Sequence, residues 1–320
     1  MTQKPQRHYF LVCLIFLIFF VVSFLTNIIG PLVPEIIDSF KLSLALAGLL
    51  PFSFFIAYAV MSIPAGFLVE KYREKKVMLA AFGLALAGAL LFALFPAYLI
   101  STISLFLIGL GMAILQVAIN PLLRVAGGEE HFAFNSALAQ IIFGSASFLS
   151  PLLYSYLARN LPVVEKQNLL LNSLRRLVPP NLPWVSLYWV FALIAFLMIL
   201  IVFASHFPRV ELKEEEKAGT WAIYKILLKK KIVILYFFGI MAYVGTEQGV
   251  ANWTSQFLKT YHGLDPQTAG AQAVSYFWGL MTIGGLFGLL LLKLVDSRRI
   301  LIGAVSLALV CLTLALWGPP

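Results

Sequence analysis

Charged and reactive side chains are scarce in this chain. Asp, Glu, Lys and Arg together make up 12% of the residues, against about 25% in soluble domains. The two cysteines, Cys13 and Cys311, stand in separate apolar runs without the spacing of a disulfide framework or of metal ligands. This scarcity excludes a small disulfide-stapled domain and a cysteine-based metal centre.

Catalytic motifs are also missing from the apolar runs. The four histidines stand near the ends of these runs or between them. No His pair, HExxH motif or pairing of a serine with a base occurs inside a run. We therefore expect a protein that is not an enzyme and that holds neither a metal nor an organic cofactor.

Apolar residues, in contrast, are abundant. They make up 61% of the chain, more than one aqueous core can bury. They gather in runs of about 20 residues, the length at which a helix crosses the hydrocarbon of a bilayer, and a chain in lipid must satisfy its own backbone hydrogen bonds. The sequence predicts an all-α polytopic membrane protein with the lipid bilayer as partner, its nine helices lying near 9–34, 43–69, 77–98, 99–123, 133–157, 185–206, 232–257, 268–292 and 299–318.

Basic residues fall unevenly between these runs. With a cytoplasmic N-terminus, seventeen Lys and Arg residues lie in cytoplasmic segments and six lie outside. The positive-inside rule therefore predicts a cytoplasmic N-terminus in a plasma (inner) membrane. The same loops account for the net charge of +9, so we expect no nucleic-acid partner.

A charged segment, residues 207–231, separates six runs from the last three. It carries three consecutive glutamates and then apolar residues among lysines, which fits either an amphipathic helix at the interface or a solvated loop. Two-bundle transporters share this layout. We predict a six-helix N-terminal bundle in 1–206 and an incomplete C-terminal bundle of three helices in 232–320. A complete second bundle needs three more helices, so we expect a fragment or a naturally shortened protein.

One acid stands apart from the others. Of the fourteen acidic residues, Glu247 is the only one that we place inside a spanning run, and Gly245 and Gly249 flank it where a helix can loosen. Ionisable groups in hydrocarbon are costly and usually mark a pathway. We predict that Glu247 couples transport to a cation, as a proton carrier or a Na+ ligand. Pairing with a cationic substrate, or a protonated carboxyl bonded to a neighbouring helix, is the alternative.

The segment after the second run combines a glycine, an acid and several bases. From Gly66 it reads Gly-Phe-Leu-Val-Glu-Lys-Tyr-Arg-Glu-Lys-Lys, which resembles the G-x-L-x-D-R-x-G-R-K signature of the major facilitator superfamily. The resemblance implies that family's two-bundle fold, of whose twelve helices nine are present here, and a cytoplasmic gate motif of Gly66, Glu70, Lys71, Arg73 and Lys75. Arg73 stands where the second glycine usually lies. Ordinary positive-inside charges are the alternative.

Local patterns further resemble the fucose-permease-like sugar:cation symporters of that superfamily. Gly-Met-Ala-Ile-Leu-Gln116 with Asn120-Pro, and Leu-Ala-Gln140, are similar to the patterns G-x-x-x-x-E-T-x-x-N-P and N-L-A-Q. The resemblance implies a small-molecule substrate related to a sugar. Gln116 replaces a proton-coupling Glu, and Gly30 replaces an Asp of the first helix. The proton route of the family therefore does not transfer directly.

Amides and aromatic rings make up the candidate substrate site. Gln116 and Asn120 are four residues apart and share one helix face, and amides both donate and accept hydrogen bonds, as sugar hydroxyls require. Asn27 lies beside Gly30 and Pro31, which favour an interrupted helix at cavity depth. The alternative role of Gln116 and Asn120 is to join helices by hydrogen bonds, and that of Asn27 is to satisfy a kinked backbone. The candidate substrate-binding residues are Asn27, Gln116, Asn120, Gln140, Asn252, Trp253, Tyr276 and Trp278.

These features predict a secondary active transporter of a small polar, sugar-like solute that works as a monomer by cation-coupled symport with alternating access. No cofactor is expected besides H+ or Na+ as the coupling ion. A proton-coupled exporter of drugs or metabolites is one alternative, because the first run is strongly apolar. A degenerate, non-transporting membrane sensor is another, because acidic positions of the family are replaced.

Overall fold

The computed structural model describes residues 9–163, 169–207, 225–292 and 294–317. Within these ranges the regular secondary structure is entirely helical. Nine of the described helical segments are long and apolar enough to cross a membrane, and each covers one of the nine predicted runs. The predicted class, an all-α polytopic membrane protein, is confirmed.

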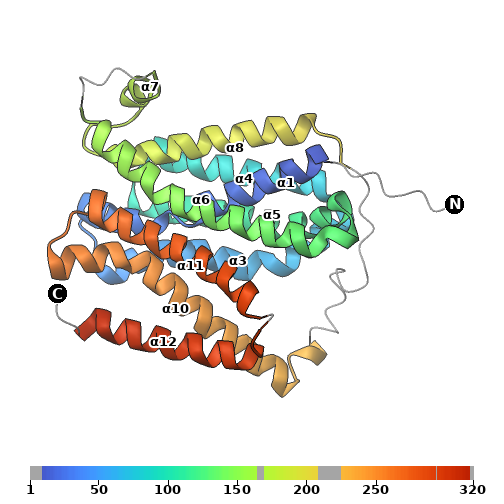
Figure 1. The fold of residues 1–320 in the computed structure, drawn as a ribbon. Helices are drawn as coiled ribbons and strands as arrows, with labels where there is room; N and C mark the ends of the chain where they lie inside the picture. The colour runs from blue at the N-terminus through green and yellow to red at the C-terminus, as the bar shows by residue number, and fades with distance from the viewer. Residues whose placement is uncertain (1–8, 164–168, 208–224, 293, 318–320) are drawn as a thin grey trace.

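Six spans form a first group of helices (Figure 1). They comprise α1 (Tyr9–Thr26) with α2 (Ile29–Phe40), α3 (Leu44–Tyr72), α4 (Glu74–Leu94), α5 (Tyr98–Gly127), α6 (Phe132–Asn160) after the turn η1 (Glu129–His131), and α8 (Ser186–Ala204) after the turn η2 (Pro183–Val185). The short helix α7 (Leu169–Leu177) lies between α6 and α8. The last three spans are α10 (Lys231–His262), α11 (Ala271–Leu291) with η4 (Pro266–Gly270) before it, and α12 (Ser297–Trp317).

The first span is interrupted at Asn27 and Ile28. Pro31 explains the break, because its ring clashes with the carbonyl of the residue four positions earlier, which is Asn27. The predicted interruption is therefore confirmed. The predicted end near residue 34 is wrong, because α2 accommodates Pro34 and continues to Phe40.

This extension corrects a second expectation. Glu35 and Asp38 lie in α2, within the apolar segment Tyr9–Phe40, so Glu247 is not the only acid in a spanning helix. Glu35 is partly buried and Asp38 is exposed. The expected loosening at Gly245 and Gly249 is also wrong, because α10 is one continuous helix from Lys231 to His262.

The first six spans pack into one apolar core. Small residues let the helices approach closely, as is usual in membranes. A Cβ on Gly88 of α4 would lie 2.7 Å from the carbonyl oxygen of Ser104, and one on Gly111 of α5 would lie 2.5 Å from that of Ala81. Aromatic rings fill the space beside α8, where the ring centroids of Phe92 and Tyr188 are 3.9 Å apart.

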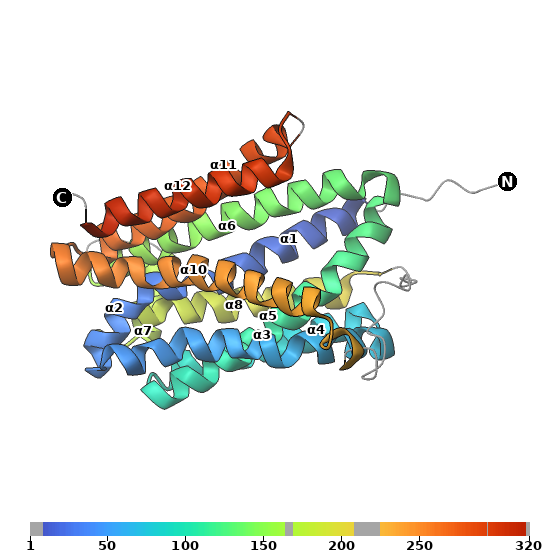
Figure 2. The ribbon, with the colours of Figure 1, turned by 90° about the horizontal axis from the view of Figure 1, so that it is seen from below.

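Of the last three spans, α10 and α11 lie against this group, from one end to about the middle of α6 and α11. We call that end the α2 end; α2, the C-termini of α6 and α10, and η4 all lie there. Figure 1 shows α10 beside α2 at the left and increasingly distant from the first six spans toward the right. Figure 1 shows α12 at the bottom, with α10 and α11 between it and the first six spans; Figure 2 shows the same helices from below, and no residue of α12 is buried.

Most of the predicted linker, residues 208–224, lies outside the described residues, so the choice between an amphipathic helix and a loop stays open. The division into 1–206, 207–231 and 232–320 also stays a prediction. Between α6 and α8, the guanidinium of Arg175 on α7 donates to the carbonyls of Asn160 and Leu161. This contact holds α7 against the end of α6.

Arg73 alone separates α3 from α4, and its backbone has φ 67° and ψ 156°. This region is populated almost only by glycine, because a Cβ there meets the backbone. It is also the position at which the gate-motif signature has glycine.

We therefore expect Arg73→Gly to raise the free energy of unfolding by about 1 kcal/mol, since it removes this strain. Thermal unfolding in detergent measures the change. Arg73→Ala removes the same charge but keeps the Cβ, so it should give no gain. Equal gains from both variants would contradict the strain explanation.

Candidate functional site

At the α2 end, the last three spans approach the first six closely enough to exclude side chains. A Cβ on Gly30 of α2 would meet the carbonyl oxygen of Ala251 on α10, and one on Gly144 of α6 would meet the side chain of Thr282 on α11. The hydroxyl of Ser275 on α11 donates to the carbonyl of Phe148 on α6 at 2.6 Å. These contacts close the space between the two groups of helices at this end.

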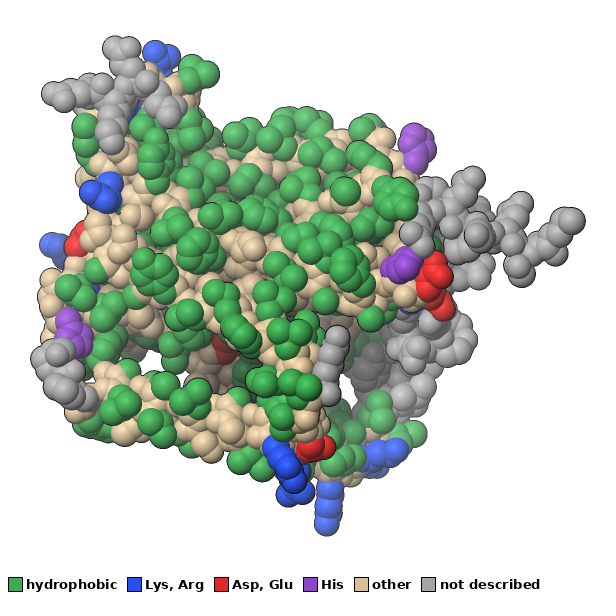
Figure 3. All heavy atoms as spheres, in the orientation of Figure 1, with side chains coloured by type: hydrophobic (Ala, Val, Ile, Leu, Met, Phe, Trp, Pro, Cys, Tyr) green, Lys and Arg blue, Asp and Glu red, His purple; other side chains and the backbone are tan. Residues whose placement is uncertain are grey.

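Toward the other end, the space opens. From Lys231 to Thr246 no residue of α10 is buried, and on α11 burial ends at Trp278. Figure 3 shows hollows between the arm of α10 and α12 and the rest of the molecule. The two groups of helices therefore enclose a wedge that is shut at the α2 end.

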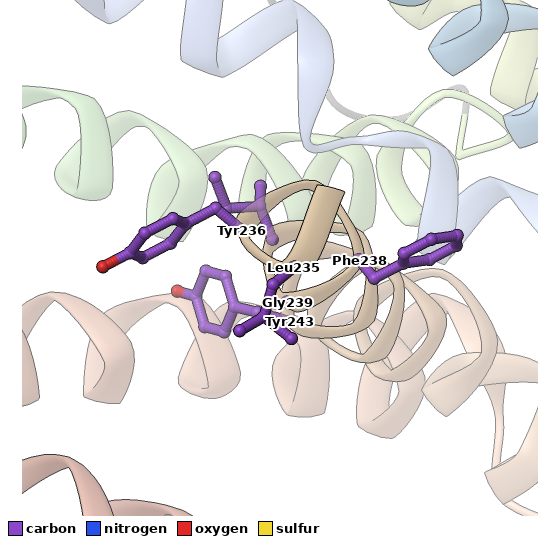
Figure 4. Close-up of a pocket in the computed structure, with 6 residues that line it drawn as sticks. Leu235, Tyr236, Phe238, Gly239 and Tyr243 are labelled. Atoms are coloured by element: carbon purple, nitrogen blue, oxygen red, sulfur yellow. The ribbon is translucent and has the colours of Figure 1, made fainter. Parts of the chain in front are cut away.

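A pocket of about 620 Å³ lies along the open half of α10, lined by Leu235, Tyr236, Phe238, Gly239, Ile240 and Tyr243. Figure 4 shows the rings of Tyr236 and Tyr243 on the same side of the helix, and Phe238 on the opposite side. Its lining is mainly apolar, with the two phenols as its polar groups.

Glu247 lies where α10 passes from its exposed half to its buried half. Its carboxylate accepts a hydrogen bond from Nε2 of Gln248 at 3.3 Å, and the phenol of Tyr243 lies beside it. Within the part of the chain that the structure describes, no basic residue pairs with Glu247. The carboxylate is partly buried, so it can exchange a proton or hold a cation without first breaking an ion pair.

The three amides predicted on α5 and α6 keep some exposure. Asn120 and Gln140 are exposed, and Gln116 is partly buried. Asn120 Nδ2 donates to the carbonyl of Gln116 at 3.2 Å, which confirms that the two share a face of α5. No hydrogen bond among the described residues joins these amides to Glu247, so a site that uses both needs a molecule between them.

Asn27 has a different environment. It is buried, and its Nδ2 donates to Ser147 Oγ on α6 at 2.8 Å and to Ser23 Oγ at 3.4 Å. Ser23 Oγ lies 2.7 Å from Ser147 Oγ. The amide therefore bridges α1 and α6 beside the break, which is neither of the two roles considered for it.

Of the four predicted substrate-binding residues on α10 and α11, three pack against other helices and Tyr276 is exposed. Asn252 and Trp253 belong to the closed contact. Asn252 is buried, and a Cβ added at Gly30 would lie 3.1 Å from its Cα; Trp253 lies beside Gly48 of α3. Tyr276 is 59% exposed and lies on a different face from Ser275. Trp278 is buried against Ala251, and its indole N–H has no hydrogen-bond partner among the described residues.

The predicted cytoplasmic gate motif lies at the other end from α2. Lys75 Nζ donates to the carbonyls of Phe203 and Ser205 at 2.8 and 2.6 Å, so it caps the C-terminus of α8. Glu70, Lys71 and Arg73 are exposed, and Gly66 is partly buried. Within the described residues the three exposed charges form no ion pair, and the gating role of this motif stays a prediction.

Sequence reasoning missed four polar residues that join the two groups of helices. They are Glu35 and Asp38 on α2, Lys259 on α10 and Gln267 in η4. A usable signal was present, because Glu35 and Asp38 are three residues apart and share one helix face beyond Pro34. Ending the first run at Pro34 placed them in a loop.

Comparison with known proteins decides the family. The model of the Major Facilitator Superfamily matches residues 15–320. The chain belongs to this superfamily. The resemblance predicted from the gate motif is thereby confirmed, and the nine spans belong to a major facilitator fold.

Two curated members of the superfamily are similar over nearly the whole chain. A glucose/galactose transporter of Brucella abortus is 28% identical over 326 residues, which cover 99% of this chain and 76% of that protein. The L-fucose-proton symporter of Escherichia coli is 26% identical over 334 residues, covering 96% of this chain and 72% of that protein. The resemblance to fucose-permease-like members is confirmed.

Solved major facilitator structures share the fold. A bacterial homologue of the human lysosomal transporter Spinster, in an inward-facing and unoccupied conformation, superposes with a TM-score of 0.73 at 16% identity, covering 92% of this chain and 64% of that one. The fucose symporter in its outward conformation gives 0.61 at 23% identity, covering 91% and 73%. Both superpositions show the shared fold.

The contact of α6 with α11 yields a stability prediction. In Gly144→Ala the new methyl group meets Thr282, and overpacking of this kind costs about 1–3 kcal/mol. We expect a lower midpoint of thermal unfolding in detergent. Gly239→Ala is the matched control, because a Cβ there meets nothing within 4 Å. If both variants have the same midpoint, α6 and α11 are not in contact as described.

Proposed function

We propose that this chain is a cation-coupled sugar transporter that imports its substrate by alternating access. The relatives' names support a hexose or a related sugar as substrate, and the symporter among them supports H+ as the coupling ion. Its residence in the membrane follows from its helices and its superfamily. The N-terminus is proposed to be cytoplasmic, as the distribution of basic residues favours.

One observation carries this proposal: the wedge between the two groups of helices is shut at the α2 end and open at the other. With the proposed orientation, the α2 end is extracytoplasmic and the wedge opens to the cytoplasm. A two-bundle transporter that has released its substrate inside has this arrangement.

The side chains around the wedge suit a sugar. Gln116, Asn120 and Gln140 supply amide donors and acceptors for hydroxyl groups, and tyrosines on α10 add phenol groups and apolar faces. In a hydrocarbon surrounding, such polar groups are retained mainly where they serve a pathway. Asn252 and Trp253 stand in the closed contact and Trp278 packs against Ala251 beside it, so we propose that they meet the sugar only when that contact opens.

Glu247 is the proposed coupling residue. It lies midway along α10, without a basic partner among the described residues. A proton that binds there neutralises a charge that is costly in a low-dielectric surrounding. Movement of α10 between two positions would then change the side of the membrane with which Glu247 exchanges its proton.

Uptake in vesicles tests this function. Right-side-out vesicles holding the protein receive glucose, galactose or fucose, while the H+ and Na+ gradients are imposed separately. We expect accumulation of at least one sugar that depends on the H+ gradient. Accumulation in everted vesicles alone would favour the exporter, and sugar binding without exchange would favour the non-transporting sensor.

Replacement of Glu247 tests the coupling role. In Glu247→Gln we expect gradient-driven accumulation to fall to the level of passive equilibration, because no titratable group remains. Sugar exchange between the two sides without a gradient should persist. Asp296→Asn, which removes an exposed acid beside α12, is the control. Full accumulation by Glu247→Gln would remove Glu247 from the mechanism.

A further inference from the structure

Two polar contacts cross from α2 to the last three spans at the closed end. Lys259 Nζ on α10 forms an ion pair with Asp38 Oδ2. One turn deeper on α2, Glu35 Oε1 accepts a hydrogen bond from Gln267 Nε2 at 2.9 Å. Both contacts join residues more than 200 positions apart in the sequence.

The backbone brings these four side chains together. On α2, Glu35 and Asp38 are three residues apart, so they project from one face. After α10, Gly263 adopts φ 64° and its N–H bonds to the carbonyl of Lys259, the 5→1 bond of an αL helix cap, while Leu264 N–H bonds to the carbonyl of Leu258. This turn reverses the direction of the chain directly after α10, so Gln267 lies on the same side as Lys259.

Asp265 fixes the start of η4. Its carboxylate accepts from the backbone N–H of Gln267 at 3.2 Å and from the hydroxyl of Thr268 at 2.7 Å. The position of Gln267 is therefore set by a local cap rather than by its contact with Glu35. A side chain held in place loses less conformational entropy when it binds, which strengthens the contact that it forms.

We propose that these two contacts, Asp38 with Lys259 and Glu35 with Gln267, form an outer latch that holds the extracytoplasmic end closed. The proposal rests on the proposed function for the meaning of closed and open. It adds the residues that set the balance between the two states. The apolar contacts at Gly30 and Gly144 supply packing, and the latch supplies contacts that break when α2 and α10 separate.

The surrounding charges make the latch sensitive to loss of Lys259. Three carboxylates, on Glu35, Asp38 and Asp265, gather at this end, and Lys259 is the base that pairs with one of them. Tyr154 of α6 is buried and its hydroxyl lies beside Glu35. Removal of Lys259 leaves mutually repelling carboxylates on the two sides of the contact, which favours separation.

Solvent access to a buried position between the bundles measures opening without any need for transport. Asn252 is 7% exposed and lies against Gly30, so Asn252→Cys serves as the reporter in a protein whose Cys13 and Cys311 are replaced by Ala. Vesicles are treated from outside with a membrane-impermeant maleimide. We expect slow labelling in this background.

Breaking the latch should speed the labelling. For Asp38→Lys or Lys259→Asp we expect a rate roughly two- to five-fold higher, the range that a solvent-accessible ion pair supports. Glu35→Gln should still give a folded protein. Gln267→Leu should raise the labelling rate by a similar factor. The exchanged pair, Asp38→Lys with Lys259→Asp, should return the rate toward background, because it restores an ion pair with opposite polarity.

Matched controls exclude general effects of charge and polarity. Arg176→Asp reverses an exposed charge on α7 at the same end, and Gln272→Leu removes an exposed amide from the first turn of α11; both should leave the rate unchanged. If Asp38→Lys fails to fold, Asp38→Asn gives the same comparison. Single variants at the rate of these controls, or an exchanged pair that labels as fast as the singles, would overturn the latch. If the labelling rates change as predicted but the protein takes up no sugar, the result counts against the proposed function and not against the latch.

Discussion

Close approach of α2 to α10 is the contact on which the rest of the arrangement depends. Gly30 meets the backbone of Ala251 without a side chain between them. Lipid tails are as apolar as leucine, so burial of apolar surface does little to bring spanning helices together. Close packing of small residues and polar contacts must supply the attraction. Both are concentrated at the α2 end, which explains why the bundles join there and nowhere deeper along α10.

A joint at one end has consequences for function. Helices that are packed along their whole length cannot separate without a large loss of contacts, whereas a short contact has few interactions to break. Serine and glycine on α6 and α11 extend the joint only to the middle of those helices. Beyond it the amides of α5 and the carboxylate of Glu247 keep some exposure. Because the contact between the two groups of helices is short, much of α10 stays exposed and the closed end can open again.

Much of the fold follows from composition and helix length. The nine spans, the break beside Asn27 and the shared face of Gln116 and Asn120 could all be predicted, since each depends on local chemistry. The family could be predicted from the gate motif, even though Arg73 replaces a glycine and adopts the backbone that a glycine would. Each of these features depends on residues that are close together in the sequence.

Features that depend on distant residues could not be predicted in this way. Pro34 suggested the end of a helix, yet α2 continues past it to Phe40. Asn27 carried the pattern of a cavity residue, but Ser147, 120 positions away, takes its amide. Trp253 was assigned to the substrate, whereas in the closed state it lies against α3. Each depends on a partner that periodicity does not indicate.

The central claim, two groups of helices joined at one end that exchange which end is shut, can be measured directly by distances between spin labels. One pair, on Lys41 and His262, spans the closed end, and a second pair, on Phe134 and Tyr236, spans the open end; all four side chains are exposed. With glucose and an imposed H+ gradient, we predict that the first distance lengthens while the second shortens. Two distances that stay fixed, or that change in the same direction, would contradict the account.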